Sequence, residues 1–167
     1  MKAIFNILII LFSALVLSNC NYKNDELWNE EKTQIREWLN ANGIVDYYED
    51  PNTGYFYYFT DIDSARGGRP NPSSLVEVNY TASVLNNNPF YSTPSNETEF
   101  IQLSETITGW QLGFTNFFVN SKAVLLLPSR LGYGSNGLKD SSKNYIVPPN
   151  SILFFEIHLV EVHPHFK

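Results

Sequence analysis

The sequence predicts an α+β fold in which an antiparallel β-sheet packs against one short α-helix. Three segments carry this prediction. Residues 75–84 alternate apolar and polar side chains, which is the period of a half-buried strand. Residues 123–127 form a continuous apolar run, and residues 152–162 place four large apolar side chains on one face, so both are expected to be strands. Residues 110–118, between the first two strands, have the apolar spacing of a short helix.

Turns and loops separate these elements. The run Asn86-Asn87-Asn88-Pro89 and the single Asn120 predict turns, because asparagine tolerates positive φ better than other residues with a side chain. Residues 132–149 hold three glycines, two prolines and many polar residues, so we expect an irregular loop there.

The N-terminal half predicts a helix followed by a hairpin. Asn24 or Asp25 can cap the helix and Gly43 can end it. The helix has an apolar stripe that needs a partner surface, and Glu31 interrupts this stripe. Residues 44–49 and 55–60 flank a turn-forming string, which favours a β-hairpin. Residues 64–74, rich in glycine and proline, predict a linker.

The first 20 residues are typical of an export signal. Lys2 precedes an apolar core from Ile7 to Leu17, which is too short to span a bilayer because a spanning helix needs about 20 residues. The segment ending at Cys20 resembles a bacterial lipobox, although Asn19 stands where Gly, Ala or Ser is usual. This resemblance implies lipidation of Cys20 and a lipid anchor in the bacterial cell envelope, on the periplasmic side or at the outer membrane. The alternative is that Cys20 is an ordinary free or buried thiol.

Composition bounds the remaining possibilities. The 167 residues suffice for one domain of ordinary size, and 43% hydrophobic residues indicate a chain that folds. With 11 Lys and Arg against 17 Asp and Glu, a nucleic-acid partner is not expected. The single cysteine excludes an intrachain disulfide and a multi-cysteine metal site. His158, His163 and His165 near the C-terminus are not expected to bind a metal.

Five motifs then occur in order along the chain: 78–81, Phe90, 107–110, 127–134 and 147–156. Together they resemble the FKBP-type peptidyl-prolyl cis/trans isomerases. The resemblance covers about residues 75–162. It divides the chain into a lipoprotein-type signal peptide (1–19), an extension with helix, hairpin and linker (20–74), the isomerase domain (75–162) and a tail (163–167).

The resemblance implies a fold, an activity and a site. The fold is an antiparallel sheet wrapped around one short helix, with the substrate proline bound between them. Carried over position by position, the catalytic pocket consists of Tyr80, Phe90, Ile107, Trp110, Tyr133, Val147 and Phe155. Trp110 would form its floor, and the Ile107 N–H and the Tyr133 hydroxyl would bind substrate carbonyls. Further substrate-binding candidates are Tyr91, Thr106 and Ile146. Each aromatic side chain has an alternative interpretation as an ordinary core residue.

The implied chemistry needs no cofactor and no metal. The barrier to rotation about a peptide bond is about 18–20 kcal/mol, because amide resonance must be broken. An apolar pocket with a few hydrogen-bond donors favours the twisted amide without any nucleophile or base. The resemblance implies proline-containing polypeptides and FK506-like macrolides as partners, a monomeric protein, and a role in the folding of exported proteins.

One departure from the family pattern bears on activity. Tyr91 stands where the family usually has Asp beside the pocket. We expect this change to weaken catalysis or macrolide binding. The alternative function is therefore a catalytically weak proline-binding or chaperone-like module that docks onto an envelope complex.

Overall fold

The computed structural model describes residues 25–62 and 67–163. The expected signal peptide, Cys20, residues 64–66 of the expected linker and His165 lie outside the described residues.

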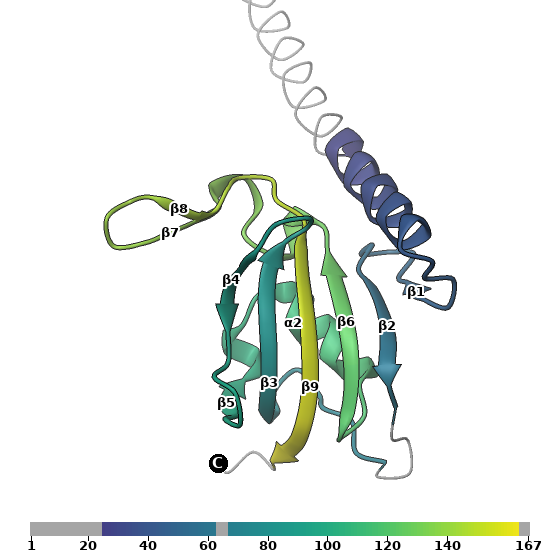
Figure 1. Cartoon of the computed structure of the whole chain (residues 1–167), viewed down its shortest axis with the longest axis vertical. Coiled ribbons are helices and arrows are strands. Elements are labelled where there is room, and N and C mark those ends of the chain that lie inside the picture. Colours follow the sequence, from purple (N-terminus) through teal and green to yellow (C-terminus); the bar gives the residue numbers. More distant parts are fainter. Residues whose placement is uncertain (1–24, 63–66, 164–167) are drawn as a thin grey trace, which may run out of the picture.

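The main element is a seven-stranded antiparallel sheet with strand order β1-β2-β6-β9-β3-β4, in which β5 also pairs with β3 (Figure 1). Its strands are β1 (Tyr48–Glu49), β2 (Phe56–Asp61), β3 (Leu75–Val84), β4 (Pro89–Ser92), β5 (Glu99–Gln102), β6 (Ser121–Leu127) and β9 (Leu153–His163). The short strands β7 (Leu138–Lys139) and β8 (Tyr145–Val147) form a separate hairpin that projects from the sheet (Figure 1).

Few helices accompany the sheet. A helix covers residues 25–41, drawn in purple in Figure 1. The helix α2 (Thr108–Gly113) lies against the sheet, and the 3₁₀ turns are η2 (Leu103–Glu105), η3 (Phe114–Asn116), η4 (Ser129–Leu131) and η5 (Gly134–Asn136). The predicted α+β class is thus confirmed. Among the described residues, no helix combines the length and the hydropathy needed to cross a membrane.

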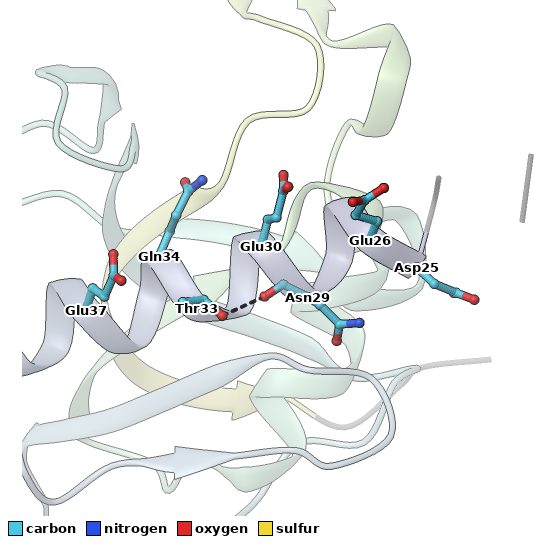
Figure 2. A pocket seen from close by; sticks show the side chains of 7 residues that line it. All are labelled: Asp25, Glu26, Asn29, Glu30, Thr33, Gln34 and Glu37. Carbon is cyan, nitrogen blue, oxygen red and sulfur yellow. Dashed lines mark hydrogen bonds between the residues drawn. The ribbon is translucent and has the colours of Figure 1, made fainter. Parts of the chain in front are cut away.

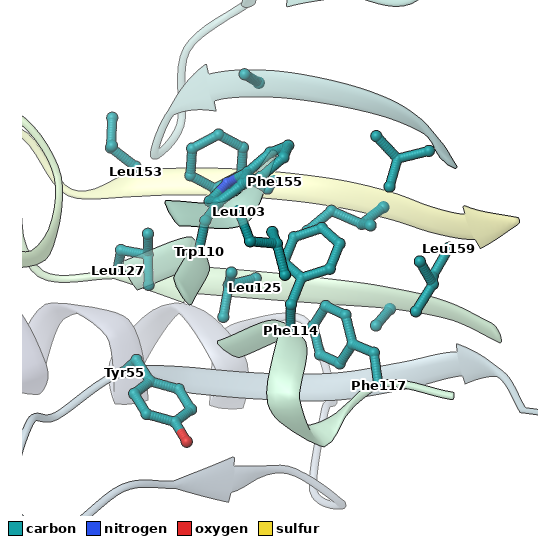
Figure 3. Packing of buried hydrophobic residues seen from close by; sticks show 14 of the residues in the cluster. Tyr55, Leu103, Trp110, Phe114, Phe117, Leu125, Leu127, Leu153, Phe155 and Leu159 are labelled. Atoms are coloured by element: carbon teal, nitrogen blue, oxygen red, sulfur yellow. The ribbon is translucent and has the colours of Figure 1, made fainter. Parts of the chain in front are cut away.

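The larger core lies between α2 and one face of the sheet (Figure 3). Trp110 and Phe114 of this helical segment pack there with Leu125, Leu127 and Phe155 from the strands. The helix approaches β6 closely because Gly109 faces it. A Cβ atom at Gly109 would lie 2.2 Å from Cδ1 of Leu127, well inside van der Waals contact. This contact brings Trp110, the next residue, down against the sheet.

The helix of residues 25–41 covers the opposite face. Its Ile35 and Leu39 are fully buried against Phe56, Val124 and Leu126. Trp38 meets the ring of Phe154 edge-on, with 5.2 Å between the ring centroids. Since β6 is therefore buried on both faces, its sequence is a continuous apolar run rather than an alternating one.

The elements predicted from clear periodicity are confirmed. The 75–84 strand, the first hairpin and the turns at Asn86 and Asn120, both with positive φ, all occur. The N-terminal helix covers residues 25–41 and ends before Gly43, while Asn24, one of its two candidate caps, lies outside the described residues. The sheet, however, contains strands from both sides of the domain boundary expected at residue 75. Strand β2, from the expected extension, pairs with β6 of the expected isomerase domain from Phe56↔Leu126 to Asp61↔Lys122. The division into an extension and an isomerase domain at this residue stays a prediction.

Three details of the prediction were wrong. The short helix begins at Thr108 and not at residue 110, and its last turn is the separate η3. The expected loop of residues 132–149 contains the β7–β8 hairpin and η5. Strands β4 and β5 were missed, because four-residue strands between turns have too few positions to show a period.

Candidate functional site

A cavity of about 530 Å³ opens between α2, the sheet and the β7–β8 hairpin. Its lining residues are Tyr80, Ala82, Phe90, Tyr91, Ile101, Glu105, Thr106, Ile107, Trp110, Tyr133, Leu138, Ile146 and Phe155. Nine of the ten candidates, six of the seven carried over from the family pattern and the three further substrate-binding candidates, are therefore brought together here. The tenth, Val147, is buried in the adjacent core, where it pairs with Leu138 across the hairpin.

Trp110 lies at the centre of the aromatic lining. Its ring makes edge-to-face contacts with Tyr80, at 4.9 Å between ring centroids, and with Phe155, at 5.5 Å. Its indole Nε1 is buried and has no hydrogen-bond partner among the described residues. Edge-to-face packing fixes the orientation of the indole. A flat, immobile apolar surface results, of the kind that a proline ring can pack against.

Tyr91 lines the cavity and is held in place by contacts with Tyr80 and Glu99. Its ring stacks on Tyr80 with centroids 4.9 Å apart, and its hydroxyl donates a hydrogen bond to the Glu99 carboxylate. The Thr93 hydroxyl donates to the same carboxylate oxygen at 3.3 Å. Burial raises the pKa of Tyr80, and the negative charge of Glu99 raises it further. Tyr80 is therefore a neutral phenol at physiological pH.

Besides the buried indole N–H of Trp110, two donors at the cavity have no partner among the described residues. Ile107 stands at the N-cap of α2, where its carbonyl accepts from the Trp110 N–H at 3.0 Å. Its own N–H makes no hydrogen bond within the described parts of the chain. Burial raises the pKa of Tyr133, so its hydroxyl stays protonated, and no described residue accepts its hydrogen bond.

The electrostatic character of the cavity is set by Glu105, the one ionisable side chain in its lining besides the tyrosines. The remaining surface is aromatic, aliphatic or the Thr106 side chain, whose hydroxyl is already bonded to the Leu103 carbonyl at 2.7 Å. Such a site offers no nucleophile and no metal ligand set. What it can do is exclude water from a bound segment and donate hydrogen bonds to its carbonyls.

Four lining residues were not anticipated. Ala82 follows Tyr80 on the same face of a strand whose alternation was recognised, so the period itself could have indicated it. Ile101 lies on the missed strand β5, Glu105 ends η2, and Leu138 lies on the missed hairpin. No sequence signal pointed to these three.

A second hollow runs along the exposed face of the N-terminal helix. It is lined by Asp25, Glu26, Asn29, Glu30, Thr33, Gln34 and Glu37, and Figure 2 shows Glu26, Glu30, Gln34 and Glu37 projecting from the same side of the helix. None of these side chains is apolar. A proline ring has nothing to pack against here, so the aromatic cavity is the better candidate for a site.

Within residues 25–62 and 67–163, no three His, Cys, Asp or Glu side chains form a group that could hold a metal. A ring nitrogen of His158 lies 3.4 Å from Oδ1 of Asn120, and Nε2 of His163 lies 3.3 Å from a carboxylate oxygen of Glu77. Each of these two histidines therefore lies within hydrogen-bonding distance of one polar side chain of the fold.

Comparisons with known proteins agree with this geometry. The model of the FKBP-type peptidyl-prolyl cis-trans isomerase family matches residues 67–160, more than half of the chain. FkpA of Escherichia coli is 27% identical over 154 residues, which cover 92% of this chain and 54% of that protein. FK506-binding protein 2 of Candida glabrata is 32% identical over 95 residues, covering 54% of this chain and 66% of that protein. The chain thus spans between about half and two thirds of the length of these relatives.

Solved structures show the same fold. The crystal structure of E. coli FkpA matches with a TM-score of 0.65 and 25% identity, covering 93% of this chain and 70% of that one. The crystal structure of a peptidyl-prolyl cis-trans isomerase from Pseudomonas syringae matches with a TM-score of 0.64 and 23% identity, covering 81% of this chain and 96% of that one. The sheet with its single short helix therefore has the FKBP architecture that the sequence predicted, and this chain belongs to the FKBP-type peptidyl-prolyl cis-trans isomerase family.

Proposed function

We propose that this chain is a peptidyl-prolyl cis/trans isomerase whose site is the aromatic cavity. The observation that supports this most is the placement of Trp110, whose indole is held edge-on by Tyr80 and Phe155 in the lining of the aromatic cavity of a member of this family. Its substrates would be proline-containing segments of unfolded polypeptides.

The catalysis would rest on the low polarity of the cavity and on its hydrogen-bond donors, with no covalent step. In the planar amide, resonance places partial charges on oxygen and nitrogen, whereas the twisted amide at the transition state has lost this polarity. An apolar cavity therefore favours the twisted form relative to the planar form. The Ile107 N–H and the Tyr133 hydroxyl would hold carbonyls on either side of the proline in the twisted geometry. Uncatalysed exchange takes tens to hundreds of seconds, so a modest reduction of the barrier is measurable.

Tyr91 supports the alternative, a catalytically weak proline-binding or chaperone-like module. Its ring covers part of Tyr80, and its hydroxyl is committed to Glu99. The carboxylate that the family usually has at this position is thereby replaced by an aromatic ring. We infer a reduced turnover, and a weakened response to FK506-like macrolides, with proline binding retained.

The cellular role is a further proposal. The export-type N-terminus and the lipobox-like segment support lipidation of Cys20 and a lipid-anchored protein that assists the folding of exported proteins in the cell envelope. The expectation of a monomer rests on the family resemblance alone. Mass spectrometry of the protein from a bacterial host tests the lipidation. The N-terminal peptide should carry acyl chains on Cys20 and should lose them in Cys20→Ser. An unmodified N-terminal peptide starting elsewhere would overturn it.

A proline-limited refolding assay with the full chain tests the activity. Acceleration should be seen with the wild-type chain and be lost in Trp110→Leu. Trp38→Leu is the matched control, since it removes the same ring from the opposite face of the sheet. It should lower stability but leave the acceleration of a folded sample in place. A folded wild-type chain that binds proline peptides without accelerating refolding would establish the alternative function.

A further inference from the structure

The helix of residues 25–41 contacts the segment that leads to Tyr133. Glu31, only 3% exposed, accepts a hydrogen bond from the Ser129 N–H at 3.0 Å. The guanidinium of the next residue, Arg130, lies 3.7 Å from the ring centre of Trp28, in the same helix as Glu31. The helix therefore contacts two successive residues of η4, the turn that follows β6.

The first hairpin holds the same turn from another side. Nη2 of Arg130 donates hydrogen bonds to the carbonyls of Thr53 at 3.2 Å and Asn52 at 3.4 Å. Both carbonyls belong to the connection between β1 and β2. Arg130 is thus fixed by the helix and the hairpin together, although its side chain lies at the surface.

The backbone between η4 and Tyr133 is short and is held by hydrogen bonds. The Leu131 N–H donates to the Pro128 carbonyl, and the Gly132 N–H donates to the Ser129 carbonyl, both at 2.9 Å. A Cβ on Gly132 would lie 2.5 Å from Cδ1 of Leu153, so the backbone sits directly on β9. Because these hydrogen bonds and the contact with Leu153 restrain the backbone, a displacement of Ser129 would be passed on to Tyr133.

A carboxylate at position 31 is not explained by packing. The position lies on the apolar stripe of the helix, where a leucine would fill the space without desolvating a charge. Burial raises the pKa of Glu31 despite hydrogen bonds from the Ser129 hydroxyl and backbone, and its Oε1 has no partner among the described residues. What glutamate adds over leucine at this position is the contact to Ser129.

We propose that Glu31 and Arg130 are positioning residues that fix Tyr133 in the wall of the aromatic cavity through the η4 turn. The N-terminal helix and hairpin would then determine the geometry of the substrate site without touching the substrate. This inference rests on the proposed function in one respect, namely that the Tyr133 hydroxyl binds a substrate carbonyl.

The first test measures the turn directly, without any activity. Glu31→Leu keeps the volume and removes the acceptor, whereas Glu31→Gln keeps an acceptor oxygen. In the full chain, amide hydrogen exchange at Leu131 and Gly132 should accelerate in Glu31→Leu, stay near wild type in Glu31→Gln, and leave the β9 amides unchanged. Leu39→Ala, buried in the same helix away from η4, is the control, and it should accelerate exchange throughout the sheet instead. Unchanged exchange at Leu131 in Glu31→Leu would overturn the proposal.

The second test is a double-mutant cycle on proline-peptide binding. Glu31→Leu and Tyr133→Phe should each weaken binding by about two- to tenfold, the usual effect of one hydrogen bond. Combined, they should weaken it little more than Tyr133→Phe alone, because Glu31 acts through that hydroxyl. Additive losses would overturn the proposal. If Glu31→Leu does not fold, the exposed Arg130→Ala takes its place in both tests with the same expectations.

The two proposals fail in different ways. A wild-type chain that neither binds nor isomerises proline peptides contradicts the proposed function, while the exchange experiment still decides whether Glu31 fixes η4. An active wild-type chain with additive losses contradicts only the positioning role.

Discussion

Removal of residues 25–74 is expected to prevent the rest of the chain from folding, although the family match begins only at residue 67. The deleted part supplies β2, which pairs along β6, and the helix that covers the outer face of that strand. Without them, β6 becomes an exposed edge strand whose Val124 and Leu126 face water. A flat apolar edge of this kind promotes aggregation.

The magnitude follows from the buried side chains. Ile35, Leu39 and Phe56 are each 0% exposed. Burial of one such side chain stabilises a fold by about 1.5–3 kcal/mol, so the three together contribute about 5–9 kcal/mol as an upper estimate. A domain of this size has a total free energy of unfolding of about 5–15 kcal/mol. The loss is therefore comparable with the entire stability.

Urea denaturation followed by circular dichroism measures this effect on chains that begin at residues 25, 44 and 75. The first retains every described element and should unfold cooperatively. The second lacks only the helix and should be less stable by about 3–6 kcal/mol, the share of Ile35 and Leu39. The third should show no cooperative transition. A cooperative transition of the third chain at the same urea concentration as the first would refute this reasoning.

Three further changes have expected outcomes. Tyr133→Phe should weaken proline-peptide binding by about 0.5–1.5 kcal/mol in calorimetry and leave the urea midpoint unchanged, because the hydroxyl has no partner among the described residues; unchanged binding would remove Tyr133 from the site. Gly109→Ala should lower the free energy of unfolding by about 1–2 kcal/mol, since overpacking against Leu127 exceeds the gain in helix propensity, and a stabilised variant would contradict the close approach. Glu31→Gln should gain free energy of unfolding relative to the wild type as the pH rises from 4 to 7, measured by urea denaturation at each pH.

The long strands could be predicted because period and burial coincide in them. In β3, Val76 and Val78 are buried and Glu77 between them is not, so the alternation in the sequence there is the alternation of the two faces. The short strands β4 and β5 could not be predicted, since they form by pairing with β3 rather than by any pattern of their own. The start of α2 was misplaced because Gly109 disfavours helix locally, whereas here its missing side chain permits the contact with Leu127.

The site was predictable only in part. The aromatic positions followed from the family resemblance, and the structure places nine of the ten candidates around one cavity. Their roles stay predictions. Contacts made by distant segments left no signal: Glu31 was noted only as an interruption of an apolar stripe, yet it bonds a backbone amide 98 positions later. Such a contact depends on how the helix docks, which a local pattern does not contain.

The pH dependence of stability should reveal the state of this buried carboxyl group. Burial raises the pKa of Glu31 above its ordinary value of 4.5. A carboxyl whose pKa is higher in the folded than in the unfolded state binds more protons when folded, so its contribution to stability is full below pH 4.5 and is lost as the pH rises through the folded-state pKa. Glutamine does not titrate and still offers Ser129 an acceptor oxygen. The free energy of unfolding of Glu31→Gln relative to the wild type should therefore increase from pH 4 to pH 7. Parallel pH curves for the two proteins would refute this prediction, because they would mean that Glu31 has the same pKa in the folded and in the unfolded chain.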